Sequence, residues 1–183
     1  MTDIEHKSDE VPPGLSLASP GVYYASGGFA CVDGTIVSFL KIQAALAPRR
    51  RARLCLHTDP GAAQHDMLIV MHRSSYVAPH CHLSKSESLA LIEGSCDLFL
   101  FDGSGQVLRT VLMAADPQAG CFLYRMPQSL FHTLRFKTEW TVFIESTIGP
   151  FDRRDTGVAT WAPPETDPDA GHRYLDGLTA SRA

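Results

Sequence analysis

From residue 54 onward the chain is built of short runs in which apolar and polar residues alternate, and glycine, proline or aspartate separates one run from the next. The runs read DMLIVMH, YVAPHCH, SLALIEGSCDLFLF, QVLRTVLM, GCFLYRMP, FHTLRF and WTVFIEST. Short strands spaced about 8 to 12 residues apart, with turn signals between them, are typical of an antiparallel sandwich or barrel. The clearest predicted hairpin has Asp102, Gly103, Ser104 and Gly105 at its turn.

One segment has helical periodicity. It begins at Asp33-Gly34-Thr35, runs through IVSFLKIQAALA and ends before Pro48. Its apolar residues recur at the spacing that places them on one helix face. We expect this to be the one substantial helix.

The chain divides into four predicted parts, and its length suits a single domain. Residues 1–20 mix charges with prolines and are expected to form a disordered arm. Residues 21–48 form an N-terminal segment with the helix, and residues 49–150 form the barrel. Residues 151–183 are expected to be a C-terminal wrapping segment and tail, which Trp161 pins to the barrel.

Composition excludes several classes of function. The formal charge of −4 does not favour nucleic acid as a partner. No apolar run approaches the roughly 20 residues that span a bilayer, and the first ten residues are acidic and polar, which predicts a cytoplasmic protein without a membrane partner. The five cysteines are odd in number and form no CxxC pair, so we expect reduced thiols.

The stretch PHCHLSKSE carries the candidate chemistry. In a strand, alternate residues point to the same face, so His80 and His82 can aim both imidazoles at one point while Cys81 faces away. Glu87 follows after a turn, and His132 lies on a later strand-like run. Any one of these histidines alone would be read as ordinary polar surface, but together with Glu87 they predict one divalent metal site. The remaining histidines are expected to be structural or exposed.

At these residues the sequence resembles the cupins, which are small jelly-roll proteins. His80, His82, Glu87 and Gly94 fit the first cupin motif, and Gly120, Pro127 and His132 fit the second, with one extra residue between Gly120 and Pro127. Three positions depart from the motifs: Ser74 and Ser129 stand where glycines are usual, and Phe136 stands where asparagine is usual. The resemblance implies an all-β fold, an antiparallel double-stranded β-helix (jelly-roll or cupin barrel) with a short N-terminal helix. All four ligand positions remain.

A closer resemblance covers roughly residues 49–165. The runs RRRARLCLH, YVAPHCH with KSE, GPFD and WAPPE look like the WbuC-type cupins, which are associated with bacterial surface-polysaccharide gene clusters. This resemblance implies a sugar or sugar nucleotide as the small-molecule substrate. Cupin barrels commonly pair through their sheets, so a homodimer is also expected by resemblance.

Four further residues are candidates for substrate binding. Tyr76 shares the alternation of His80 and would form a pocket wall, and Lys85 would reach the cavity mouth or point to solvent. Arg53 belongs to the run Arg49 to Arg53, which either presents guanidinium groups to an anionic substrate or is a solvated segment paired with acids such as Glu145. Glu145 itself lies in an apolar strand and is either a buried pocket acid or a structural partner of arginine.

Mixed histidine and carboxylate ligation leaves open coordination positions and does not select among Fe, Mn, Ni and Zn. We therefore expect a metal-dependent enzyme, isomerase-like, epimerase-like or dioxygenase-like, acting on a small polar molecule. The alternatives are a non-haem iron dioxygenase and a non-catalytic ligand-binding module that the metal stabilises. The sequence assigns no catalytic residue.

Overall fold

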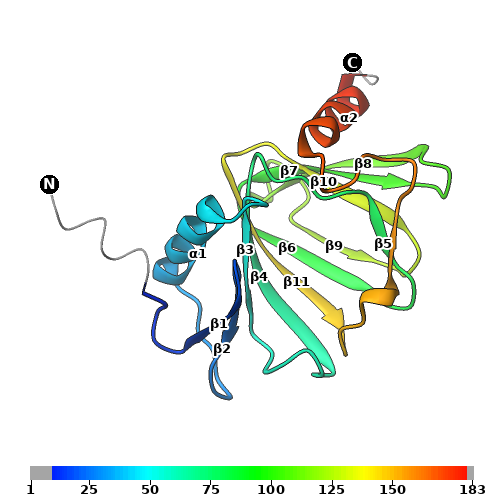
Figure 1. The fold of residues 1–183 in the computed structure, drawn as a ribbon. Coiled ribbons are helices and arrows are strands. Elements are labelled where there is room, and N and C mark those ends of the chain that lie inside the picture. Colours follow the sequence, from blue (N-terminus) through cyan, green and yellow to red (C-terminus); the bar gives the residue numbers. More distant parts are fainter. Residues whose placement is uncertain (1–9, 181–183) are drawn as a thin grey trace, which may run out of the picture.

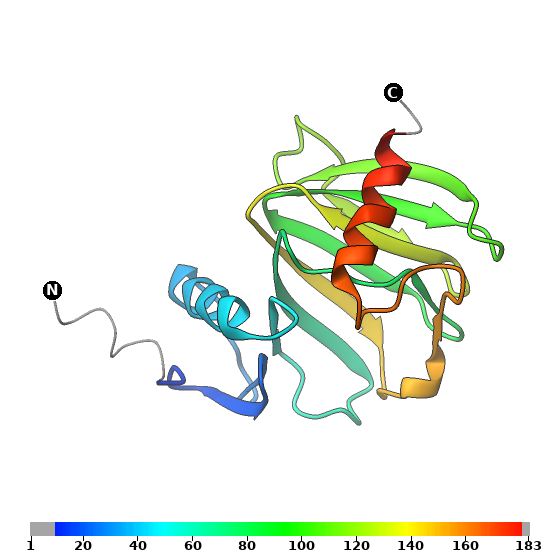
Figure 2. The same cartoon turned by 45° about the horizontal axis from the view of Figure 1, so that its top comes forward.

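Two β-sheets packed face to face form the body of the protein in the computed structural model, which describes residues 10–180. One helix lies against the outer side of each sheet (Figure 1 and Figure 2). Strands distant in sequence become neighbours within each sheet, as in an antiparallel jelly roll. The predicted all-β double-stranded β-helix with a short N-terminal helix is confirmed.

The larger sheet has seven strands and supplies the wall that carries Glu87 and Glu145. Its spatial order is β1 (Leu15–Ser19), β2 (Val22–Ala25), β3 (Arg51–Cys55), β4 (Gln64–His72), β11 (Trp140–Ile148), β6 (Glu87–Glu93) and β9 (Leu123–Met126). Every neighbouring pair is antiparallel except β2 and β3, which are parallel.

The smaller sheet has five strands and carries the three motif histidines. Its order is β12 (Thr156–Val158), β5 (His80–His82), β10 (Phe131–Phe136), β7 (Ser95–Phe101) and β8 (Val107–Ala114), all antiparallel. A short 3-10 turn, η1 (Arg153–Asp155), precedes β12. The hairpin predicted around residues 102–105 joins β7 to β8.

The barrel core lies between the two sheets and follows from the alternation in each strand. Leu89 and Leu91 on β6, Phe143 on β11 and Leu134 on β10 all point inward and are buried. Because successive side chains of a strand point to opposite faces, the intervening residues face outward. Two further apolar clusters then form on the outer faces, one under each helix.

Helix α1 (Gly34–Leu46) forms at the predicted segment. The Asp33 carboxylate caps it by accepting hydrogen bonds from the backbone N–H groups of Thr35 (2.9 Å) and Ile36 (3.1 Å). Leu40 and Ala44 are fully buried against the outer face of the seven-stranded sheet. The helix thereby closes one side of the molecule.

Three features of the chain ends differ from the sequence prediction. Residues 15–19 of the expected disordered arm form β1, because LSLAS pairs with VYYA of β2; residues 1–9 of that arm lie outside the described residues. Helix α2 (Pro168–Ala180) was not expected and covers the five-stranded sheet. Strand β12 joins that sheet beside β5. The division of the chain into four parts stays a prediction.

Helix α2 was hard to predict because its sequence, PDAGHRYLDGLTA, contains two glycines and few apolar residues. Gly171 is required where the helix meets Tyr76, since a Cβ there would lie 2.5 Å from the tyrosine ring. Leu175 supplies the buried contact. Neither helix of the described residues has the length and the apolar character needed to cross a bilayer.

The turn before His132 has an unusual backbone. Ser129 has a φ of 63°, in the left-handed region that glycine adopts most easily. Its backbone N–H donates to the carbonyl of His82 at 2.7 Å. The serine therefore adopts the conformation for which the motif usually has glycine, and it ties the turn to β5.

Candidate metal centre

Three histidines from two neighbouring strands form a cluster inside the barrel. His80 and His82 lie on β5, and His132 lies opposite His80 on β10. One ring nitrogen from each lies within 4.8 Å of one from each of the other two. Cys81 belongs to the opposite face of β5 and lies against Gly157 of β12. The i, i+2 spacing on β5 and the pairing of β5 with β10 thus bring together the three histidines that the sequence singled out.

The backbone sets the orientation of two imidazoles. Nδ1 of His80 lies 3.0 Å from the carbonyl oxygen of Ala78, and Nδ1 of His132 lies 3.0 Å from that of Leu130. A carbonyl only accepts, so each Nδ1 carries a hydrogen and donates it. In the neutral ring the Nε2 lone pair is then free, which is the tautomer that a metal ion requires.

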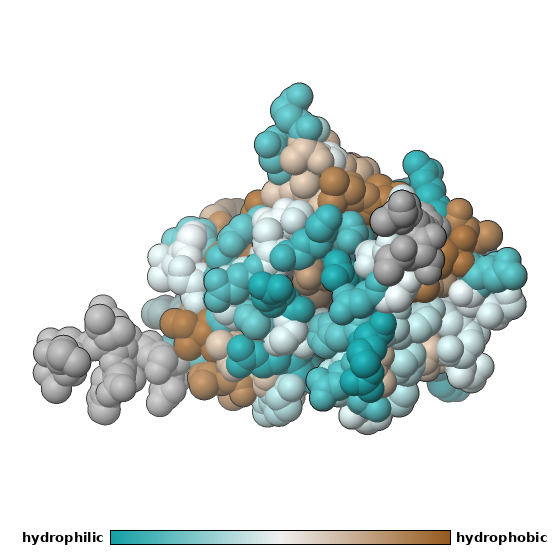
Figure 3. All heavy atoms as spheres, turned by 90° about the horizontal axis from the view of Figure 1, so that it is seen from above, coloured by the Kyte–Doolittle hydropathy of each residue, from teal (hydrophilic) through white to brown (hydrophobic). Residues whose placement is uncertain are grey.

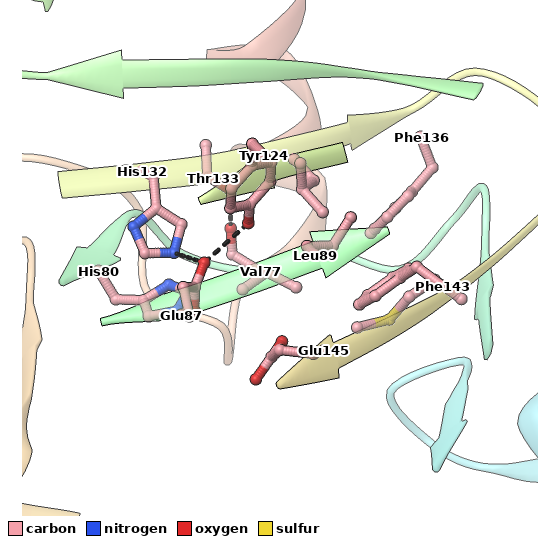
Figure 4. A pocket seen from close by; sticks show the side chains of 12 residues that line it. Val77, His80, Glu87, Leu89, Tyr124, His132, Thr133, Phe136, Phe143 and Glu145 are labelled. Atoms are coloured by element: carbon pink, nitrogen blue, oxygen red, sulfur yellow. Dashed lines mark hydrogen bonds and ion pairs between the residues drawn. The ribbon is translucent and has the colours of Figure 1, made fainter. Parts of the chain in front are cut away.

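Glu87 lies beside the histidines at the first residue of β6. Its Oε2 is 2.9 Å from Nε2 of His82, and its Oε1 is 3.1 Å from Nε2 of His132. The Tyr124 hydroxyl on β9 donates to Oε1 at 2.7 Å. Figure 4 shows His132 and Tyr124 approaching the same carboxylate from different sides. This buried carboxylate supplies the negative charge of the site.

Protons can occupy the positions that an ion would take. Burial alone would raise the pKa of Glu87, but hydrogen bonds from His132, His82 and Tyr124 hold it well below its usual range. Burial opposes charge on His132, yet the hydrogen bond and charge of Glu87 outweigh burial and raise its pKa. Burial and the neighbouring His132 lower the pKa of His80 to about 4.

The donor set fits a divalent first-row metal ion. Imidazole nitrogens and carboxylates are common ligands for such ions, and the burial of Glu87 favours a positive charge that balances it. Because Nδ1 of His80 and of His132 donates to a backbone carbonyl, Nε2 is the nitrogen that each neutral ring offers to an ion. The residues present therefore fit a metal ion, which Nε2 of the three histidines and the Glu87 carboxylate would hold.

A cavity of about 50 Å³ adjoins the cluster. His80, His132, Glu87 and Tyr124 line its polar end together with Glu145 of β11. Apart from Thr133, the rest of its wall is apolar (Figure 4). Burial and the charge of Glu87 raise the pKa of Glu145 to about 7, although His82, His132 and Arg53 act in the opposite sense. Glu145 is therefore a pocket acid and has no hydrogen-bonded arginine partner among the described residues.

Tyr76 does not lie where the sequence predicted it. Its hydroxyl donates to the carbonyl of Pro163 at 2.8 Å, and its ring is buried beside Phe99 and Leu175, under helix α2. Residues 73–79 are irregular between β4 and β5, so the strand alternation of His80 does not extend back to Tyr76. The prediction of a pocket wall was wrong for this residue.

The basic residues near the barrel differ in whether their side chains have a partner among the described residues. The guanidinium groups of Arg49 (2.9 Å) and Arg51 (3.1 Å) pair with Glu165, not with Glu145. The ammonium of Lys85 donates to the carbonyl of Pro150. Arg53 is exposed and forms no ion pair with a described residue, but it is close enough to influence Glu145. Substrate contacts by Lys85 and Arg53 stay predictions.

The sequence analysis missed Tyr124. Its run, GCFLYRMP, reads as a strand, but nothing in it marks the hydroxyl as a partner of Glu87. The contact depends on the pairing of β9 with β6, where Tyr124 is opposite Leu89, two residues from Glu87. Pairing between non-consecutive strands leaves no signal in the spacing of residues.

Comparison with known proteins indicates the fold of this chain and assigns it no activity. Residues 32–113 match the model of a family described as a domain of unknown function, DUF6016, which is less than half of the chain and includes His80, His82 and Glu87. Among curated proteins, none matches this sequence.

Three solved structures illustrate the likeness. A structure of CapF matches at 12% identity and a TM-score of 0.50, over 69% of this chain and 40% of CapF. Oxalate decarboxylase from Bacillus subtilis matches at 16% identity and a TM-score of 0.46, over 59% of this chain and 27% of the enzyme. A protein from Klebsiella pneumoniae subsp. pneumoniae, described as having a double-stranded β-helix domain, matches at 14% identity and a TM-score of 0.44, over 60% and 79%.

At these identities the likeness concerns the fold alone. This chain spans 40% of the matched CapF and 27% of the matched decarboxylase, so their activities are not transferred with it. The strand order of this chain agrees with the fold that the comparisons indicate. The chain is a double-stranded β-helix protein with a candidate metal site inside its barrel.

Proposed function

We propose that this protein is a metal-dependent enzyme that acts on a small polar molecule at the mouth of the barrel. The observation that supports it most is the convergence of His80, His82 and His132 beside the buried Glu87, with two of the imidazole tautomers already fixed by backbone carbonyls. A divalent ion held there would supply Lewis-acid chemistry or, if it were redox-active iron, dioxygen chemistry.

The surrounding residues have the roles that such a reaction needs. Tyr124 holds Glu87 in place through its hydroxyl, and Glu87 orients two imidazoles. Glu145 can take or give a proton near neutral pH, because burial raises its pKa to about 7. Arg53, exposed on the neighbouring part of the sheet, would attract an anionic substrate group.

The substrate class implied by the family resemblance is a sugar or sugar nucleotide. The cavity of about 50 Å³ is too small for a sugar ring, since a cavity known to bind benzene has about 150 Å³. A sugar derivative would therefore bind at the mouth, near Arg53, and only a substituent would enter. A homodimer and a cytoplasmic location remain part of the same proposal.

The test begins with protein purified without a metal-binding tag, because such a tag would bias the metal content. Elemental analysis identifies the ion, and the loaded form is then screened for turnover of sugar nucleotides and keto acids. We expect about one ion per chain, and turnover that is lost when the ion is removed and reduced in Glu145→Gln.

A non-catalytic module predicts a different outcome. In that case, removal of the ion lowers the melting temperature, ligands still bind to the loaded form, and no substrate is turned over. Turnover that persists in the metal-free protein would contradict both readings. Oxygen consumption during turnover would identify the dioxygenase alternative.

A further inference from the structure

We propose that the molecule bound at the histidine cluster carries a short apolar group of about two to four non-hydrogen atoms, and that this group fills the cavity inside the barrel. The polar end of the molecule would lie at the histidines. The inference rests on the proposed function and narrows its substrate class. Its basis is the size of the cavity, its lining and the lack of free hydrogen-bonding groups in its inner part.

The inner wall of the cavity is apolar. It is formed by side chains from both sheets and from the segment before β5, namely Met71, Val77, Leu89, Leu134, Phe136 and Phe143. Figure 4 shows Leu89, Phe136 and Phe143 on the side away from His80 and His132. A bound molecule therefore meets polar atoms at one end and hydrocarbon at the other.

Polar groups near this wall are already paired. The Thr133 hydroxyl donates to the carbonyl of Val77 at 2.6 Å, and the Tyr124 hydroxyl donates to Glu87. A hydroxyl placed among Leu89, Leu134 and Phe143 would lose its hydrogen bonds to water without replacement, which costs on the order of 1–3 kcal/mol. The inner cavity thus selects against polyhydroxylated groups and favours a short alkyl group.

The volume limits the length of this group. A cavity needs about 10–15 Å³ to hold one water, so about 50 Å³ accommodates a few atoms and no ring. Each methylene that moves from water into the cavity should improve binding about fourfold until the space is filled. Beyond that length, the chain would collide with the wall and affinity should fall.

The experiment uses the metal-loaded protein and a series of straight-chain monocarboxylates as probes. Formate, acetate, propionate, butyrate and hexanoate are titrated by calorimetry. We expect affinity to rise about fourfold per carbon to an optimum at propionate or butyrate, whose alkyl groups have two and three carbons, and to fall at least tenfold from that optimum to hexanoate.

Substitutions at Leu134 change the cavity without touching a predicted metal ligand. Leu134→Ala should shift the optimum to longer acids by one or two carbons, and Leu134→Phe should abolish the gain above formate. Leu134→Val is a milder enlargement that serves if Leu134→Ala does not fold. Val142→Ala is the matched control, because Val142 is buried on the outer face of the seven-stranded sheet, towards α1 and away from the cavity, and should leave the series unchanged.

The outcomes separate the two proposals, because metal content is measured for every sample. If the wild-type protein binds no metal, the proposed function fails, and this inference fails with it. If metal binds but affinity is independent of chain length, or if Leu134→Ala and Val142→Ala shift the optimum equally, only this inference is overturned. A length optimum that moves with Leu134 alone supports it.

Discussion

The two ends of the barrel interior are built from the same strands but have opposite chemistry. Strand β6 contributes Glu87 at the mouth and Leu89 two residues further in, and β10 contributes His132 and then Leu134. In β11 the order along the chain is reversed, with Phe143 inside and Glu145 at the polar end. Alternation along a strand determines whether a residue faces the barrel interior. Its position along the strand determines whether it lies at the polar end or at the apolar end.

The comparison distinguishes the residues that stabilise the fold from the residues that carry the candidate chemistry. The apolar end gains free energy from burial, while the polar end costs free energy unless each charge is compensated. Glu87 is compensated by three donors, whereas Glu145 has no hydrogen bond to a described residue. Substitutions at the two ends should therefore give different classes of effect.

The largest effect is expected at the polar end. His82→Ala removes one of three imidazoles and should reduce metal from about one ion per chain to near zero, a greater loss than the roughly 10- to 100-fold decrease in affinity that follows removal of a group that only holds a ligand. Elemental analysis after dialysis measures it. Cys81→Ser is the control and should keep the metal. Loss of metal in Cys81→Ser with retention in His82→Ala would reverse the assignment of strand faces.

Next in size is an effect at the apolar end. Phe143→Ala removes a side chain that is 2% exposed and should lower the free energy of unfolding by about 3–5 kcal/mol. Denaturant unfolding of the metal-free protein measures the change. Metal stoichiometry under native conditions should be retained. A stable Phe143→Ala protein without metal would show that the two ends are not separable.

The smallest effect concerns pH. It tests how much the ionised Glu145 carboxylate lowers the free energy of unfolding. The folded-state pKa of Glu145 is raised to about 7, above its ordinary value of 4.5, so the folded state favours the protonated acid. Its contribution to stability is present below about pH 4.5 and is lost as pH rises to 7. Glu145→Gln should therefore gain stability relative to wild type across this window.

We expect that gain to be on the order of 1–3 kcal/mol in the metal-free protein, reduced because the side chain keeps some contact with solvent. Urea unfolding of both proteins at several pH values between 4 and 8 measures it. A difference that does not change with pH would mean that folding leaves the pKa of Glu145 unchanged.

The sequence was sufficient for those parts of the site that depend on local spacing. His80 and His82 are two residues apart in one strand, and Glu87 follows after one turn. Tyr76 was misplaced because alternation holds only within a strand, and the chain is irregular before β5. Tyr124 was missed because its contact depends on pairing between β9 and β6, which are separated by β7 and β8 along the chain.

The fold divides in the same way. The alternating runs and the Asp33 cap predicted the barrel and α1, since both signals are local. Strand β1 and helix α2 were missed because each is stabilised by what it contacts more than by its own pattern. LSLAS is a strand when it pairs with β2, and α2 depends on Leu175 and on the closeness of Gly171 to Tyr76.

Ser129 shows what a turn motif conserves in physical terms. A non-glycine residue in the left-handed region costs roughly 1–2 kcal/mol, and here hydrogen bonds from its N–H to His82 and from its hydroxyl to Leu83 (3.3 Å) offset part of that cost. A search pattern that demands glycine at this turn would pass over this chain. The turn requires a positive φ angle, and Ser129, hydrogen-bonded to the end of β5, provides it.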